Sequence, residues 1–121
     1  MGKTIAQLGD DLAVRYLQEH GYYILERNRE GKSGEIDIVA RLGNAYHFFQ
    51  VKTKSVESLK EVSSFEKYLP EQKQGHVETA LDAYVRTHNI EKWQLDVVAV
   101  FIDIKDKKAR VEIIKNRAVD N

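Results

Sequence analysis

Four polar side chains flank a short turn in the stretch from Gly34 to Lys54, and their types suit metal-assisted chemistry. Glu35 and Asp37 precede the turn, and Gln50 and Lys52 follow it. Carboxylate and amide oxygens are ligands that hard divalent cations accept, and an ammonium group can stabilise charge that develops on a phosphate. Whether the four side chains meet depends on the register of the two segments that carry them.

The turn itself predicts that register. Gly43-Asn44 is typical of a two-residue hairpin loop, and the segments on either side of it have strand-like composition. Counting outward from this loop puts Asp37 opposite Gln50 and Glu35 opposite Lys52. Facing residues and i, i+2 neighbours share one face of a sheet, so the four side chains are expected to form a compact polar square.

Two interpretations of this square remain open from the residues alone. Polar residues also alternate along a hairpin when one face simply meets solvent, and Glu–Lys pairs across strands are common there. However, Tyr46 and Phe48 share the expected face of the square, and the opposite face is also apolar. Partial cover on both faces would make clustered carboxylates costly unless a cation joins them.

Length and composition limit the classes of protein that fit. The 121 residues suit a single domain, 1–121, with one hydrophobic core. The absence of Cys excludes disulfides, thiolate metal sites and Cys nucleophiles. Nineteen basic and nineteen acidic residues argue against a protein that coats nucleic acid through its net charge, but a local basic groove stays open. No apolar run approaches the roughly 20 residues that span a bilayer, so we expect a cytoplasmic protein without a membrane partner.

The hydrophobic pattern predicts the elements that must position the polar square. The order α-β-β-β-α-β-β indicates an α/β fold with a mixed central sheet flanked by helices. The polar segment Ser55–Leu69 has no clear assignment. The expected helices cover 4–20, stopped by Gly21, and a segment from about Pro70 to His88; the expected strands cover 22–28, 35–41, 45–52, 93–103 and 110–114.

Short motifs spread over most of the chain resemble the YraN family of small bacterial proteins. They are Gly9-Asp10, Tyr16-Leu17, Gly21-Tyr22, Arg27-Asn28 with Arg29, Gly34 to Asp37, and Gln50-Val51-Lys52. That family is similar to PD-(D/E)xK nucleases and related to archaeal Holliday-junction resolvases. The resemblance implies a restriction-endonuclease-like core, and it implies nucleic-acid cleavage only by relation, because a fold alone does not fix a function.

The resemblance also implies roles for individual residues. It implies a catalytic set of Asp37, Gln50, Lys52 and Glu35, and a metal set of Asp37, Gln50, the Val51 carbonyl and Asp10, holding Mg²⁺ or Mn²⁺. Asp10 stands where the family's first helix has Glu, and Gln50 stands where its nuclease motif has Glu. A neutral amide at position 50 removes one negative charge from the site, which weakens cation binding and water activation.

Three functions follow from this pattern as expectations. The preferred one is a metal-dependent endonuclease that hydrolyses phosphodiesters, with branched or damaged DNA as the expected substrate. The alternative is a nuclease-fold module with weak or no catalysis that binds nucleic acid or a protein partner. The third is a homodimeric interaction protein that uses the face bearing Tyr46 and Phe48 for assembly.

Overall fold

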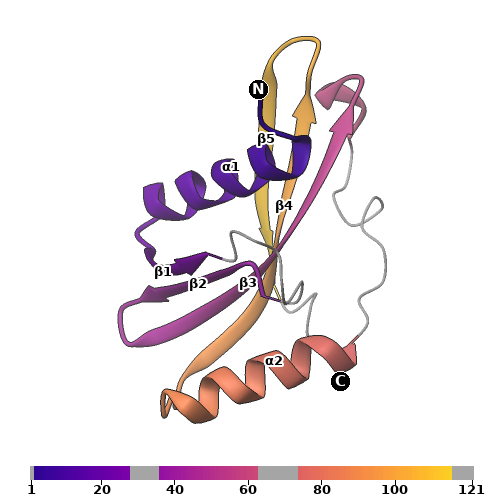
Figure 1. The fold of residues 1–121 in the computed structure, drawn as a ribbon. Helices are drawn as coiled ribbons and strands as arrows, with labels where there is room; N and C mark the ends of the chain where they lie inside the picture. The colour runs from indigo at the N-terminus through magenta and orange to yellow at the C-terminus, as the bar shows by residue number, and fades with distance from the viewer. Residues whose placement is uncertain (1, 28–35, 63–73, 116–121) are drawn as a thin grey trace.

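The computed structural model describes residues 2–27, 36–62 and 74–115. Within them, one five-stranded sheet in the order β1-β2-β3-β4-β5 has one helix on each face (Figure 1). β3 and β4 pair in parallel, and the other neighbours pair antiparallel, so the expected mixed α/β sheet is confirmed. The bounds are α1 Ile5–Glu19, β1 Tyr23–Arg27, β2 Ile38–Leu42, β3 Ala45–Val56, the 3₁₀ turn η1 Leu59–Glu61, α2 Gln74–Thr87, β4 Trp93–Asp103 and β5 Lys108–Ile114.

Local signals fix both ends of α1. The Thr4 hydroxyl accepts a hydrogen bond from the backbone N–H of Gln7, and the Gln7 side chain accepts one from the Thr4 N–H, which together form a capping box. At the other end Gly21 has a φ of +90°, and the Tyr22 N–H donates to the Leu17 carbonyl. This Schellman ending satisfies carbonyls that the helix leaves unpaired. The expected helix over 4–20 is therefore confirmed.

The β2–β3 hairpin has the expected loop and register. Leu42 faces Ala45 across Gly43-Asn44, and the same register continues to the pair Ile38 and Phe49. Gly43 has a φ of +61°, which places a positive φ at the first loop residue, as in a type II′ turn.

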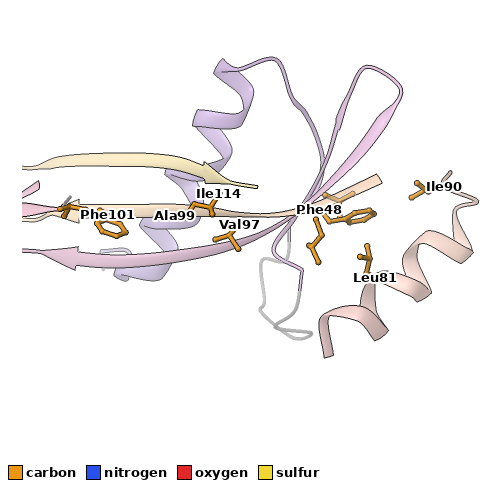
Figure 2. Packing of buried hydrophobic residues seen from close by; sticks show 10 residues of the cluster. Phe48, Leu81, Ile90, Val97, Ala99, Phe101 and Ile114 are labelled. Atoms are coloured by element: carbon orange, nitrogen blue, oxygen red, sulfur yellow. The ribbon is translucent and has the colours of Figure 1, made fainter. Parts of the chain in front are cut away.

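Two apolar clusters hold the helices against opposite faces of the sheet. β4 contributes to both, with Val97 in the α2-side cluster and Val98 in the α1-side cluster, as expected for a strand buried on both faces. Figure 2 shows the α2-side cluster, in which Leu81 and Ile90 pack near Phe48. Neither helix in the described part of the chain is long and apolar enough to cross a membrane.

Two expectations concern residues that the structure does not describe. Pro70 and most of the polar segment after Val56 lie outside the described residues, although η1 occupies part of that segment. Glu35 also lies outside them, so its expected place opposite Lys52 stays a prediction.

Candidate metal and nucleic-acid site

Asp37 lies just before β2, where the hairpin ladder becomes irregular. Its backbone N–H donates to the Phe49 carbonyl at 2.9 Å. The register that pairs Ile38 with Phe49 would instead place Asp37 opposite Gln50, so the hydrogen bond is shifted by one residue. Its Oδ2 accepts a hydrogen bond from the Val51 backbone N–H at 2.7 Å. The carboxylate therefore takes the place of a backbone acceptor and ends the strand, so β2 begins at residue 38 rather than at 35.

The same irregularity changes the faces of the residues before β2. Ile36 packs against the α2-side cluster, whereas Ile38 belongs to the α1-side cluster together with Phe49. Asp37, between them, lines a cavity with side chains of α1. The expected alternation through the start of the strand is wrong here, because an irregular hydrogen bond interrupts it.

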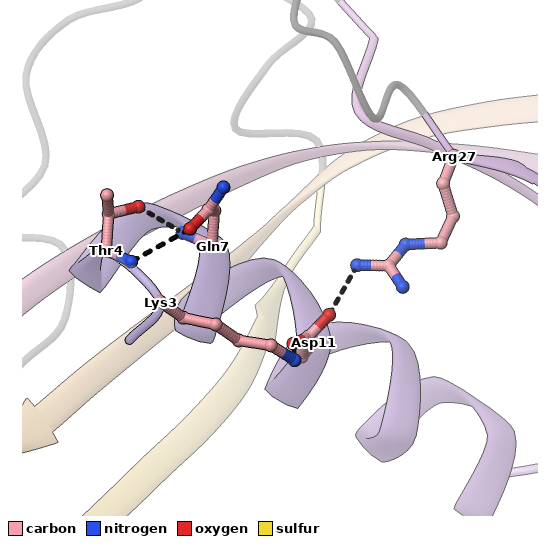
Figure 3. A network of polar contacts seen from close by, with 5 residues as sticks. All are labelled: Lys3, Thr4, Gln7, Asp11 and Arg27. Atoms are coloured by element: carbon pink, nitrogen blue, oxygen red, sulfur yellow. Dashed lines mark hydrogen bonds and ion pairs between the residues drawn. The ribbon is translucent and has the colours of Figure 1, made fainter. Parts of the chain in front are cut away.

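The cavity lies between the first turns of α1 and the adjacent ends of β1 and β2. Its volume is ≈ 250 Å³, and its acidic side chains come from α1 and from the residue before β2. Figure 3 shows Asp11 between two cations: Lys3 pairs with it from the chain before the helix, and the Arg27 guanidinium donates to it at 2.8 Å. The lining residues are Lys3, Gln7, Asp10, Asp11, Arg27, Asp37 and Ile38.

The two neighbouring acids of α1 have opposite electrostatic environments. Burial raises the pKa of Asp10, and the negative charge of Asp37 raises it further, while Arg27 lowers it in part. Hydrogen bonds from Lys3 and Arg27 lower the pKa of Asp11. Asp11 is therefore held in its ionised form by two cations, whereas the ionised form of Asp10 is disfavoured by burial and by the charges of Asp37 and Asp11.

Gln50 and Lys52 occupy the other face of β3. Phe49 and Val51 pack under α1 while Phe48 packs under α2, so strand alternation directs Gln50 and Lys52 toward the α2 side. Gln50 is 4% exposed, and its Oε1 accepts no hydrogen bond from any described residue. An unsatisfied buried amide oxygen costs about 1–3 kcal/mol, which favours a donor or a cation at this point. Lys52 is half-buried.

The candidate residues thus form two groups joined by one strand. Asp10 and Asp37 face the cavity, and Gln50 and Lys52 flank Val51, whose N–H holds the Asp37 carboxylate. In a strand the N–H and C=O of one residue point toward the same neighbouring strand, so the Val51 carbonyl is expected on the side of Asp37. The polar square expected from a regular hairpin is replaced by this two-sided arrangement in the described residues.

The donor set suits a hard cation only in part. Every candidate donor is an oxygen, and Mg²⁺ needs few protein ligands because it keeps several of its waters. Among the described residues, the cavity is lined by three acidic and two basic side chains, whose formal charges sum to one negative unit. However, no three His, Asp or Glu side chains among the described residues converge closely enough to form a metal cage. The arrangement therefore fits a water-rich ion held by Asp10 and Asp37, and not a closed structural site.

Comparison with known proteins identifies the family. The model of the uncharacterised protein family UPF0102 matches residues 9–100. This chain belongs to UPF0102. This is the YraN family that the motifs resemble, so the sequence-based assignment is confirmed.

Individual UPF0102 proteins match this chain over nearly its whole length. One from Caldicellulosiruptor saccharolyticus is 33% identical over 116 residues, covering 94% of this chain and 96% of its own. One from Dehalococcoides mccartyi is 32% identical over 114 residues, covering 94% and 92%. One from Clostridium botulinum strain Hall is 33% identical over 120 residues, covering 94% and 93%. These UPF0102 relatives place the chain in the family without assigning it a reaction.

Sequence reasoning missed two contributors to the site. Arg27 belongs to a motif that carries the family resemblance, but nothing local indicated that it would reach Asp11 across sixteen positions. Gly9 precedes Asp10, and a Cβ built on it would lie 1.9 Å from the Thr53 Oγ1, so α1 approaches β3 at a point where only glycine fits. The signal that could have found it is the Gly9-Asp10 pair itself, a glycine inside a helix beside a candidate ligand.

Proposed function

We propose that this UPF0102 protein is a divalent-cation-dependent endonuclease, acting on DNA, whose site is the cavity between α1 and the start of β2. One observation carries the proposal: the Asp37 carboxylate is held by the backbone N–H of Val51, the middle residue of Gln50-Val51-Lys52, and faces the same cavity as Asp10. Two carboxylates from separate elements are thereby kept close enough for one to raise the pKa of the other.

The electrostatics of the cavity support a cation rather than a bare anion. The raised pKa of Asp10 means that its ionised form is disfavoured beside Asp37, and a divalent cation would relieve this repulsion. The described lining residues carry one net negative charge, so a cation would also favour the approach of a nucleic-acid phosphate. This electrostatic environment supports the proposed metal dependence.

The candidate residues have separate roles in this proposal. Asp10 and Asp37 would hold Mg²⁺ or Mn²⁺, which when bound supplies activation of a water and stabilisation of phosphate charge. The Val51 N–H orients the Asp37 carboxylate. Lys52 is proposed to act on the α2 side of the strand, where Gln50 leaves a buried oxygen available to a cation. Glu35, which lies outside the described residues, is proposed to assist it. Arg27 donates to Asp11, and its positive charge offsets part of the repulsion that Asp37 and Asp11 exert on Asp10.

Cleavage assays with matched variants test the proposal. Wild-type protein should cut single-stranded, duplex or junction DNA when Mg²⁺ or Mn²⁺ is present, and should lose the activity in EDTA. Asp37→Asn keeps an oxygen that can accept from Val51, so it should fold and yet lose activity, as should Asp10→Asn. Asp82→Asn changes an exposed acid of α2 and serves as the control. Cleavage that is unchanged in Asp37→Asn, or absent from wild type with both metals, would refute the proposal.

A second candidate is a non-catalytic module that binds nucleic acid or a protein partner. The neutral amide at position 50 and the absence of a three-residue metal cage among the described residues favour it. It predicts salt-dependent DNA affinity without cleavage at any metal concentration. The homodimeric interpretation and the cytoplasmic location stay predictions; sedimentation on dilution tests the first.

A further inference from the structure

A row of aromatic and cationic side chains crosses four strands at the end of the sheet near the β2–β3 loop. Tyr23 of β1 faces Arg41 of β2, Arg41 faces Tyr46 of β3, and Tyr46 faces Trp93 of β4. We call these four residues the aromatic row. They are far apart in the sequence, and only the strand order brings them into one line.

All four side chains point to the α2 face. Ile24 follows Tyr23, Ala40 precedes Arg41, and both pack in the α1-side cluster. Strand alternation therefore directs Tyr23 and Arg41 to the α2 face. Tyr46 packs against the α2-side cluster. The Trp93 ring lies 6.2 Å from the Phe48 ring at 76°, which places it on the same face.

α2 covers the neighbouring row of side chains but leaves this one open. Tyr84 of α2 packs edge-on against Phe48, one step further into the sheet. Within the aromatic row, Tyr23 is 65% exposed and Trp93 is 40% exposed, Arg41 is exposed and Tyr46 is half-buried. Single exposed apolar residues are ordinary, but a contiguous line of three aromatic rings and a guanidinium marks a binding surface.

The charges beside the row indicate what it binds. Arg41 and Lys92 are both exposed, and neither forms an ion pair with any described residue. Lys92 directly precedes Trp93, and its carbonyl accepts a hydrogen bond from the Tyr46 N–H at 2.9 Å, so a second cationic residue stands at this end of the sheet. A ligand that satisfies both the rings and the Arg41 guanidinium has planar faces and negative charge, which is the chemistry of a nucleotide strand.

We propose that the aromatic row is a stacking platform for single-stranded nucleic acid. Rings on a sheet stack two or three unpaired bases in RNA-recognition motifs, and such stacking tolerates any sequence because every base has a π-face. Strands about 4.8 Å apart put Tyr23 and Trp93 about 14 Å from each other, enough for two to three nucleotides. Duplex DNA hides its base faces and cannot use the row.

This platform is separate from the cavity. The row lies on the α2 face, and the cavity lies on the α1 face at the opposite ends of β1 and β2. The inference therefore goes beyond the proposed nuclease and does not need a metal. Binding can be measured in EDTA, so a failure of cleavage and a failure of stacking are distinguishable.

Trp93 supplies the assay, because it is the only tryptophan of the chain. Oligothymidylate titrated in EDTA should quench its fluorescence, whereas inorganic polyphosphate, which offers charge without bases, should not. Tyr23→Ala should weaken binding about five- to a hundredfold, and Tyr23→Phe, which keeps the ring, should restore it. Arg41→Gln should reduce the dependence of affinity on salt. Trp93→Leu should weaken binding of a labelled oligonucleotide followed by anisotropy.

The matched control is Ile104→Ala. Ile104 is 57% exposed and follows β4 at its far end, about 36 Å along the strand direction from Trp93. It should bind as wild type does. The proposal is overturned if the single strand gives no quenching, if polyphosphate or duplex of the same sequence gives as much, or if Tyr23→Ala binds like the control. If Trp93 fluorescence were quenched only by a proline-rich peptide, or only when the protein self-associates, the row would bind a protein partner instead of nucleic acid.

Discussion

The contact between Gly9 and Thr53 sets the distance at which α1 carries Asp10 over the sheet, and Gly9→Ala should disturb it. A Cβ at position 9 would lie 1.9 Å from the Thr53 Oγ1 and 2.7 Å from both the Cβ and the Cγ2 of Thr53. Rotation of the Thr53 side chain can relieve the contacts with Oγ1 and Cγ2. It cannot move the Cβ, which is fixed to the backbone of β3.

The size of the effect follows from these distances. An ordinary contact begins at 3.4 Å, so the two backbones must separate by about 0.7 Å along the line of the clash. Overpacking of this kind costs typically 1–3 kcal/mol, and the severity of the contact places Gly9→Ala near the upper value, about 3 kcal/mol. Alanine regains about 1 kcal/mol through its higher helix propensity. The net loss of unfolding free energy is about 2 kcal/mol, which lowers the Tm of a chain this size by roughly 6–10 °C.

Thermal and urea unfolding of a double-mutant cycle measures this clash. Gly9→Ala combined with Thr53→Gly removes all three contacting atoms, and the helix-propensity gain cancels in the cycle, so the pair should show a favourable coupling of roughly 3 kcal/mol, the whole cost of the clash. Ala6→Gly, at an exposed position of α1, gives the helix-propensity term alone. Gly9→Ala should also weaken metal-induced stabilisation, because the retreat of α1 carries Asp10 away from Asp37. Stability equal to wild type in Gly9→Ala, or no coupling with Thr53→Gly, would refute the reasoning.

Three further predictions concern protonation and metal binding. Asp10→Asn should be more stable than wild type at pH 7, because it removes a carboxylate whose pKa is raised by burial and by Asp37. This gain in unfolding free energy should disappear as pH falls through the raised pKa, and Mn²⁺ should cancel it at pH 7. Burial lowers the pKa of His47 below its ordinary 6.5, so wild type should lose stability as pH falls below 6.5, and His47→Phe should flatten this slope in urea titrations from pH 7 to 5. Gln50→Glu should have a lower Tm than wild type in EDTA and should bind Mn²⁺ more tightly in calorimetry, whereas Gln50→Leu should fold and bind Mn²⁺ more weakly. Identical Mn²⁺ affinity in both variants would show that residue 50 does not contact the metal.

Local signals made part of this fold predictable. The glycine after His20 and the Gly43-Asn44 loop each act over a few residues, and each stands in the structure where the sequence placed it. The apolar run of β4 likewise identified a strand buried on both faces. Elements that are determined by short-range propensity and by a single period are the ones that a sequence specifies most directly.

The site was less predictable because tertiary contacts decide it. A regular hairpin register predicted Asp37 opposite Gln50. In the structure the hydrogen bond from the Val51 N–H to the Asp37 carboxylate ends the ladder, and Asp37 lines the cavity beside α1. Arg27 reaches Asp11 only because β1 runs beside the helix. The aromatic row depends on the order of four strands, which no local pattern encodes.

Gln50 connects these observations. Ionised Asp10 is already disfavoured by burial and by Asp37, and position 50 adjoins the backbone group that holds Asp37. A glutamate there would bury a further negative charge on the α2 side of β3, at a cost in stability whenever no cation is bound. Glutamine spares the metal-free protein this cost, and under the proposed function it offers a cation a neutral oxygen in place of a charged one. The proposed site is therefore expected to fill only at a higher free metal concentration than the site of the Gln50→Glu variant.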